Sequence, residues 1–275
     1  MPRSTAGERI SSSANPAVKA ARRLARRPPR GSRELLVEGP QAVAEAIGHL
    51  RRLFVTDAAA ERHPDLVASV RRAGAQVLPC TEEVLAAVSD TVNSQGLAGV
   101  ATLPTSSLDE LPSAASLMVV LVEVRDPGNL GAVIRTADAA GADAVVLVGN
   151  CVAPRNPKVV RASAGSLFHL PVIEQIAFPE LADICARHGI TLLAADAAGT
   201  VDHTAVDLRA PSALVFGNEA HGLTAAITAA CDHVVRVPIA APVRPGWSGA
   251  AESLNLAATV AVIAFEAARQ RKEGR

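Results

Sequence analysis

Short apolar runs alternate with amphipathic stretches along most of the chain. Between residues 34 and 102, strand-length runs such as LLVEG, RLFVTD and GLAGVAT are separated by segments whose apolar residues recur at helical spacing. Thr81, followed by Glu82 and Glu83, is typical of a capped helix with acidic residues in its first turn. The pattern therefore predicts a small α/β domain over residues 34–102.

A second α/β series follows residues 103–116, a stretch rich in Ser and Pro that we interpret as a linker. Its strands MVVLVEV, AVVLVG, ITLLAAD, SALVFG and HVVRVPIA are continuously apolar, and helical segments separate them. This alternation is typical of a parallel sheet covered by helices on both faces. We therefore expect a parallel-sheet domain over residues 117–275, ending in a helix from Glu252 to Arg271.

Composition narrows the classes of function. The 275 residues are 49% hydrophobic and 2% aromatic, with no Tyr, which disfavours a protein that reads RNA by stacking bases on aromatic rings. No apolar run is long enough to span a membrane, and no apolar region follows the first arginines as in an export signal. The four cysteines form no C-x-x-C pair and the seven histidines have no ligand spacing. We expect a cytoplasmic protein with no metal and no disulfide.

The net charge of zero conceals a basic N-terminal segment. Residues 1–33 contain nine Lys or Arg and one acidic residue, Glu8. We expect this segment to be a flexible arm that binds phosphate backbones by charge, or a solubilising tail, and charge alone does not separate these two interpretations.

Two loops that follow predicted strands carry unusual residues, at the strand ends where open α/β sheets bind ligands. Residues 125–141 contain a tight turn at Asn129, and Arg135 then points away from the apolar face of the helix that follows. Residues 216–223 place the carboxylate of Glu219 between two glycines that allow close approach of the backbone to a ligand.

A third, long loop over residues 237–255 meets a helix start at Ser253 and Asn255, and a loop of that length in a compact domain is more often functional than not. Each loop also has an ordinary structural interpretation. Asn129 fits a turn, Ser253 fits a helix cap, and Arg135 fits a solvated helix position. Glu219 fits a cap or an ion pair at a helix start. The signatures G-x-G-x-x-G and G-x-x-x-x-G-K-[ST] are absent, which argues against a dinucleotide dehydrogenase or a phosphate-loop enzyme.

Taken together, the three loops resemble the three motifs of the SpoU (TrmH-like) family of SPOUT RNA 2'-O-ribose methyltransferases. The matching residues are Asn129 and Arg135 in the first motif, Gly217, Asn218, Glu219 and Gly222 in the second, and Pro238, Ser253, Leu254 and Asn255 in the third. Residues 160–171, with Arg161, also match, and residues 34–102 resemble the family's small, L30e-like substrate-binding domain. The resemblance covers residues 34–272. The insertion that carries Arg244 and Trp247 departs from the family pattern.

The resemblance implies a catalytic domain with a deep trefoil knot, S-adenosylmethionine as cofactor, a homodimer whose pocket is completed across the interface, and RNA as substrate, with large-subunit ribosomal RNA the first choice. The implied catalytic residues are Arg135, Asn129, Glu219, Ser253 and Asn255. The implied cofactor-binding residues are Gly217, Asn218, Gly222, Val237, Ile239, Leu254 and Ala195. The implied RNA-binding residues are Arg161, Arg22, Arg23, Arg26 and Arg27. Two alternatives remain: a methyltransferase of the same superfamily that acts on transfer RNA, and an RNA-binding protein of this fold without activity.

Overall fold

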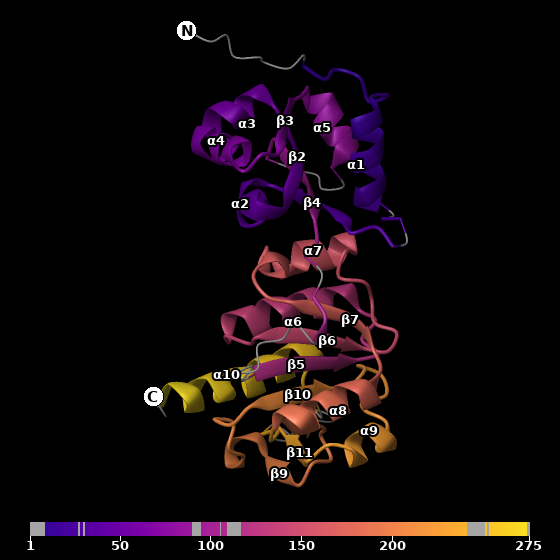
Figure 1. The fold of residues 1–275 in the computed structure, drawn as a ribbon, viewed down its shortest axis with the longest axis vertical. Coiled ribbons are helices and arrows are strands. Elements are labelled where there is room, and N and C mark those ends of the chain that lie inside the picture. The colour runs from indigo at the N-terminus through magenta and orange to yellow at the C-terminus, as the bar shows by residue number, and fades with distance from the viewer. Residues whose placement is uncertain are drawn as a thin grey trace, which may run out of the picture. The chain divides into compact units, whose positions relative to one another are not determined.

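The computed structural model describes residues 9–26, 28–29, 31–89, 95–104, 106–108, 117–240, 251 and 253–273. The chain forms two compact units (Figure 1). The first unit consists of residues 1–104 and 154–169, and the second consists of residues 105–153 and 170–275. Within the described residues, no helix combines the length and the apolar composition needed to cross a membrane.

The first unit is built on a four-stranded mixed sheet with the order β1-β4-β2-β3. Its strands are β1 (Glu34–Glu38), β2 (Leu50–Val55), β3 (Gln76–Pro79) and β4 (Leu97–Thr102). Its helices are α1 (Pro16–Arg26), α2 (Pro40–Glu45), α3 (Asp57–Arg62), α4 (Pro64–Arg72), α5 (Glu82–Val88) and α7 (Pro157–Ser163), with short 3-10 turns at Ile47–His49 and Ser166–Phe168. The predicted cap is present, because the hydroxyl of Thr81 accepts a hydrogen bond from the backbone N–H of Val84.

The basic N-terminal segment is not a flexible arm over residues 16–26, so that prediction is wrong there. Helix α1 buries Val18, Ala21, Leu24 and Ala25 in the core of the first unit, which they share with residues of α5 and of the sheet. These apolar residues recur at helical spacing and give the helix an apolar face, while its charged residues lie on the exposed face. The first unit thus begins well before residue 34 and includes residues 154–169, which the sequence assigned to the catalytic domain.

The second unit contains a seven-stranded sheet with the order β7-β6-β5-β10-β8-β11-β9, in which every paired strand is parallel to its neighbour. The strands are β5 (Leu117–Val122), β6 (Ala144–Val148), β7 (Val172–Ile176), β8 (Thr191–Ala195), β9 (Val201–Asp202), β10 (Ser212–Phe216) and β11 (His233–Arg236). The helices are α6 (Pro127–Ala139), α8 (Phe178–His188), α9 (Ala225–Ala229) and α10 (Leu256–Glu273), with a 3-10 turn at His203–Ala205. The last helix begins at Leu256, four residues later than predicted.

Helices cover the larger sheet on both faces, as its continuously apolar strands predicted. Alternate residues of β5, among them Met118 and Val120, pack in one buried cluster with Leu181 and Ile184 of α8. Helix α10 packs against β5, β10 and α6, and Figure 1 shows it across the sheet from α8. The predicted α/β class with a parallel-sheet core is confirmed.

The parallel register brings several strand ends to one edge of the sheet. Phe216 at the end of β10 lies beside Leu121 of β5 on one side and Ala195 of β8 on the other. The loops that leave these strands therefore start next to one another.

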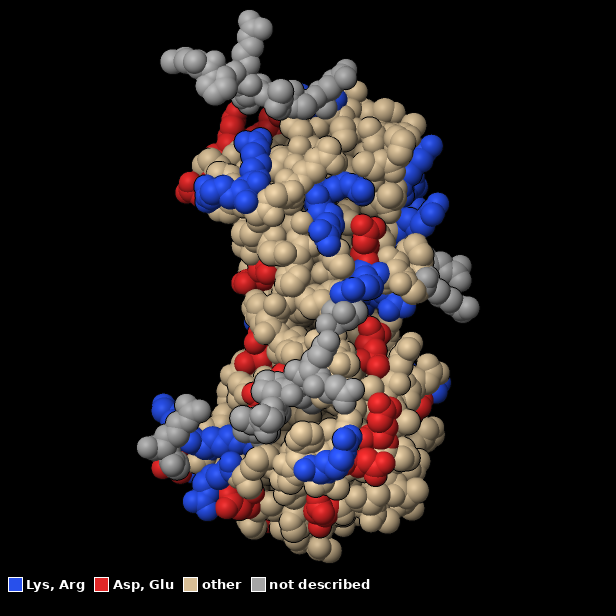
Figure 2. Space-filling view, viewed as in Figure 1, with Lys and Arg blue, Asp and Glu red and all other residues tan. Residues whose placement is uncertain are grey.

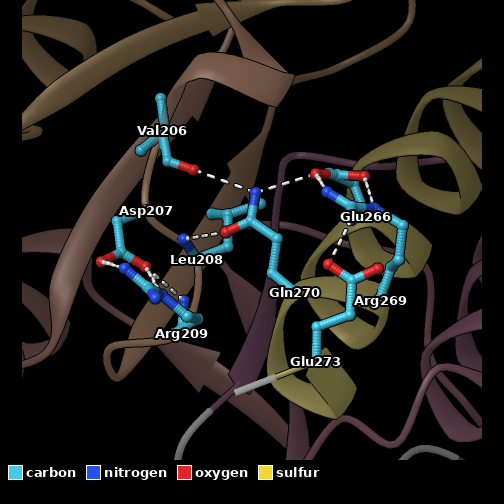
Figure 3. A network of polar contacts seen from close by, with 8 residues as sticks. All are labelled: Val206, Asp207, Leu208, Arg209, Glu266, Arg269, Gln270 and Glu273. Carbon is cyan, nitrogen blue, oxygen red and sulfur yellow. Dashed lines mark hydrogen bonds and ion pairs between the residues drawn. The ribbon is translucent and has the colours of Figure 1, made fainter.

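A polar network fixes the C-terminal half of α10 to the chain that precedes β10 (Figure 3). The side-chain amide of Gln270 accepts a hydrogen bond from Leu208 N at 2.8 Å and donates one to Val206 O at 3.1 Å. It also donates to Glu266, whose two carboxylate oxygens accept hydrogen bonds from the guanidinium of Arg269 at 2.7 and 2.9 Å. The network matters for the site because the first turns of the same helix line the cavity described below.

The pKa of Glu266 predicts an acid-sensitive helix. The hydrogen bonds from Arg269, together with the one from Gln270, lower that pKa from 4.5 to about 2. A carboxylate with a lowered pKa stabilises the fold above its unfolded pKa, and this contribution disappears as the pH falls from about 4.5 to about 2. We expect Glu266→Gln to be less stable than the wild type at pH 7 and the difference to shrink over that interval, as measured by urea unfolding.

The control for this experiment is Glu273→Gln, which removes a carboxylate that is 66% exposed and bonded to the same Arg269. Exposed ion pairs contribute little, so we expect a small loss of stability. A difference between Glu266→Gln and the wild type that stays constant from pH 7 to pH 2 would contradict the role given to Glu266.

Candidate active site

A cavity of about 410 Å³ lies at the strand edge just described, within the range of pockets that hold small ligands. It is lined by the ends of β8, β10 and β11, by residues that follow these strands and by the first turns of α10. The lining residues are Ala195, Asp196, Ala197, Phe216, Gly217, Asn218, Glu219, Gly222, Val235, Val237, Ile239, Ser253, Leu254, Asn255, Leu256, Thr259 and Ile263. Every residue that the resemblance assigned to the cofactor is in this set.

The loop after β10 is shaped by a close approach of its own backbone. Asn218 and Gly222 exchange two backbone hydrogen bonds, of 3.2 and 2.8 Å, and Gly222 has a φ of +64°. A Cβ on Gly217 would lie within about 2.5 Å of the backbone nitrogen of Leu223 and closer still to Gly222. Only glycine fits at 217 without moving the loop, and the loop consequently presents backbone groups to the cavity.

Three side chains from the three predicted loops meet in one chain of hydrogen bonds. The amide of Asn255 donates to Asn129 Oδ1 at 3.0 Å, and Asn129 Nδ2 donates to Glu219 Oε1 at 2.8 Å. Two residues of this group make further hydrogen bonds that hold the starts of two helices in place. Asn255 Oδ1 accepts from Ala257 N in the first turn of α10, and Asp126 caps α6 by accepting from Asn129 N. Residues that are 126 and 90 positions apart in sequence thus form one polar group at the cavity.

Among the predicted catalytic residues, Arg135 neither joins this group nor lines the cavity. It lies on α6, and its side chain is exposed. Ser253 and Leu254 do line it, and Leu254 and Ile239 are 40% and 38% exposed. Arg244 and Trp247 are outside the described residues.

The predicted RNA-binding residues lie in the first unit. Arg22, Arg23 and Arg26 are exposed on α1. Arg161 on α7 is exposed as well, and one of its nitrogens lies 3.9 Å from a carboxylate oxygen of Glu38. Arg27 is outside the described residues.

The sequence did not single out three residues at this edge: Asp196 and Thr259, which line the cavity, and Glu123. Glu123 follows β5 with a φ of +55°, and its backbone carbonyl accepts a hydrogen bond from Asn218 Nδ2 at 2.8 Å. The backbone N–H of Asn150 and the guanidinium of Arg125, both bonded to its carboxylate, lower the pKa of Glu123. A positive φ at a non-glycine residue leaves no sign in a single sequence.

The cavity fits the cofactor that the resemblance implies. Its apolar side chains, among them Ile239, Leu254 and Ile263, suit a flat heterocycle, while the backbone of 217–222 and the side chains of Asp196 and Asn255 suit polar groups. No group of three or more His, Cys, Asp or Glu side chains within the described residues is arranged to hold a metal ion.

Two family models match the chain. The SpoU rRNA Methylase family model matches residues 116–265, and a model described as MRM3-like substrate binding domain matches residues 15–99. The second match includes the whole of α1, in agreement with its packing. The chain belongs to the SpoU rRNA methylase family.

Relatives and solved structures agree with this assignment. The chain is 35% identical to an uncharacterized tRNA/rRNA methyltransferase of Synechocystis, over 95% of this chain and 94% of that protein. It is 32% identical to the 23S rRNA (guanosine(2553)-2'-O)-methyltransferase RlmP of Bacillus subtilis, over 84% of this chain and 86% of that protein. It is similar to the crystal structure of an AdoMet-bound rRNA methyltransferase of Sinorhizobium meliloti, with a TM-score of 0.80, 31% identity and coverage of 95% and 97% of the two chains.

These findings confirm the family, the class of enzyme and the cofactor that the sequence predicted. The protein is an S-adenosylmethionine-dependent RNA methyltransferase with a small α/β domain before its parallel-sheet domain.

Proposed function

We propose that this chain methylates a ribose 2'-hydroxyl in large-subunit ribosomal RNA. The observation that carries the proposal is the hydrogen-bonded group of Asn129, Glu219 and Asn255 at the cavity, at the position of the family motifs. The relatives support the choice of RNA, since the Bacillus subtilis protein is named for ribose methylation of 23S rRNA. The intact polar group argues against an RNA-binding protein without activity.

The cofactor, when bound, supplies a methyl group made electrophilic by its sulfonium. The residues of this chain then have two tasks, which are to hold the ribose hydroxyl in line with that methyl group and to help the hydroxyl lose its proton. Asn129, Ser253 and Asn255 orient the ribose by hydrogen bonds. Glu219 fixes the amide of Asn129, so that its donor and acceptor sides are defined. The loop 217–222, Val237 and Ile239 hold the cofactor.

Arg135 fixes the target phosphate and polarises the 2'-hydroxyl. A guanidinium keeps its proton at neutral pH, which makes it a poor base, but its planar fork can hold a phosphate oxygen and the hydroxyl at once. Arg135 is exposed and apart from the cavity lining of its own chain, which supports a site completed by a second copy.

The active form in this proposal is a homodimer whose methyltransferase domain contains a deep trefoil knot, acting in the cytoplasm. Exposed apolar side chains available to a second copy lie along α10. They are Val262 and Phe265, which are 37% and 49% exposed. Exposed apolar side chains that gather on one element are typical of an interface.

The direct test maps 2'-O-methylated nucleotides in cellular RNA with and without the gene, combined with methylation of purified large-subunit RNA. We expect one ribose methylation to disappear from large-subunit RNA in the absence of the gene. Loss of a mark from transfer RNA instead would favour the alternative substrate, and a lost methyl group on a base would exclude ribose methylation.

Helix α1 offers a surface for RNA in the first unit. Lys19, Arg22, Arg23 and Arg26 are exposed on the side opposite its buried residues. Lys and Arg alternate with Asp and Glu over the face seen in Figure 2, so that no broad field of one sign covers that face. We therefore expect RNA to be held by local basic patches that recognise charge and shape.

Replacing Arg22 and Arg23 together with Gln should weaken RNA binding and flatten its salt dependence. Each lost phosphate contact lowers the slope of log K against log salt by about one, so the pair should lower it by about two. The matched control is the pair Arg71 and Arg72, exposed at the end of α4 in the same unit. Equal effects of the two double variants in a filter-binding titration would contradict a specific role for α1.

A further inference from the structure

Glu123 has a left-handed backbone conformation, which residues other than glycine disfavour. It directly follows β5 with a φ of +55°, a region that is sterically unfavourable for a residue with a side chain. Such strain persists only where the surroundings hold it, and it is concentrated at functional sites.

The side chain of Glu123 supplies contacts that hold this conformation. Its Oε1 accepts a hydrogen bond from Asn150 N at 2.8 Å, and its Oε2 is paired with Arg125 at 3.2 Å. Gly149 leaves room for the carboxylate, because a Cβ at that position would collide with it. The backbone N–H of Glu123 is bonded to Val148 O at 3.1 Å, so the residue is anchored at its backbone and at both carboxylate oxygens.

The backbone carbonyl of Glu123 then determines the orientation of a cavity residue. It accepts from Asn218 Nδ2 at 2.8 Å, while Asn218 Oδ1 accepts from Ala220 N at 2.8 Å. Both sides of this one amide are therefore used, one to attach the loop to the end of β5 and the other to hold the turn inside the loop. Asn218 also pairs with Gly222 through its backbone, so its position governs the loop that lines the cavity.

We propose that Glu123 is a positioning residue for cofactor binding, which sets the loop 217–222 through its carbonyl bond to Asn218. Its side chain never needs to touch the cofactor in this role. The left-handed backbone aims the carbonyl at Asn218, and the carboxylate keeps the backbone left-handed. The inference rests on the cofactor site proposed above and adds a residue that lies outside all three family motifs.

The test compares variants of Glu123 by calorimetry with S-adenosylmethionine, using the full chain. Glu123→Val disfavours a positive φ and removes the carboxylate, so we expect the Kd to rise about tenfold or more. Glu123→Gly also loses the carboxylate but accepts a positive φ freely, so it should restore the Kd to within about threefold of the wild type. If Glu123→Val does not fold, Glu123→Ala takes its place, because Ala also disfavours this conformation, and its Kd should lie above that of Glu123→Gly.

The control is Gln175→Val, which also places a valine at a positive φ, of +64°, in β7 of the same unit. It should lose stability without a change in Kd. Asn218→Ala should itself raise the Kd, and adding Glu123→Val should then raise it no further, because both act through one hydrogen bond.

Additive effects of the Glu123 and Asn218 variants would overturn the positioning role, as would equal Kd values for the Val, Ala and Gly variants. Failure of the wild-type protein itself to bind S-adenosylmethionine would overturn the cofactor site and this inference with it.

Discussion

Replacing Arg135 with Ala should lower the rate of methyl transfer by at least about 100-fold, on the order of 3 kcal/mol of transition-state stabilisation. Folding and cofactor affinity should remain close to those of the wild type, because the side chain is exposed on α6 and outside the cavity of its own chain. Single-turnover methylation of RNA, measured together with calorimetry, separates the two effects.

Arg135→Lys separates charge from geometry. Lysine keeps the positive charge but loses the planar fork that can hold a phosphate and a hydroxyl together, so most of the rate should still be lost. The control is Arg187→Ala, an exposed arginine in the last turn of α8. If Arg135→Ala transfers methyl at a rate near that of the wild type, Arg135 is a solvated helix residue and the catalytic assignment is wrong.

Much of the fold could be predicted because the spacing of apolar residues along the chain indicates which positions are buried. The continuously apolar strands of the second unit required helices on both faces, and the structure has them in α8, α10 and α6. Helix α1 was missed because its charges dominated the interpretation, while its apolar face depends largely on small residues such as Ala21 and Ala25. A helix face made largely of alanine can be assigned to the core only when the element that packs against it, here α5, is known.

Long-range packing explains why the sequence assigned residues 154–169 to the wrong unit. Residues 154–169 follow β6 in sequence, yet they pack with the first unit. Their contacts there include the pair His169–Glu45 at 3.0 Å and the stacked rings of His49 and Phe168. No local pattern in the segment reveals partners more than 100 residues away.

The site could be predicted residue by residue only where a motif marked it. The motifs identified the members of the Asn129, Glu219 and Asn255 group, but the direction of its hydrogen bonds needed coordinates. Glu123 and Asp196 carry no motif, since one acts through a strained backbone and the other lines the cavity after an ordinary strand. Both residues are recognised as part of the site by their contacts in the structure and not by their residue type.

Gly217→Ala should nearly abolish cofactor binding. The added methyl group would meet the backbone of Gly222 and Leu223, which cannot turn aside as a side chain does, so the loop must open. We expect the Kd for S-adenosylmethionine to rise about 100-fold, or about 3 kcal/mol. The control is Gly48→Ala, where an added Cβ meets nothing within 4 Å. An unchanged Kd for Gly217→Ala would show that the cofactor does not bind in this cavity.

The same variant tests whether the active site is shared between two chains. If Arg135 of one chain serves the cavity of the other, then co-expressed Arg135→Ala and Gly217→Ala chains should form some mixed dimers with one intact site. Random pairing makes half of the dimers mixed and leaves about a quarter of all sites intact, so activity should return to about that level although each variant alone is inactive. If Arg135 serves its own chain, no intact site can form, and the mixture should stay as inactive as the separate variants.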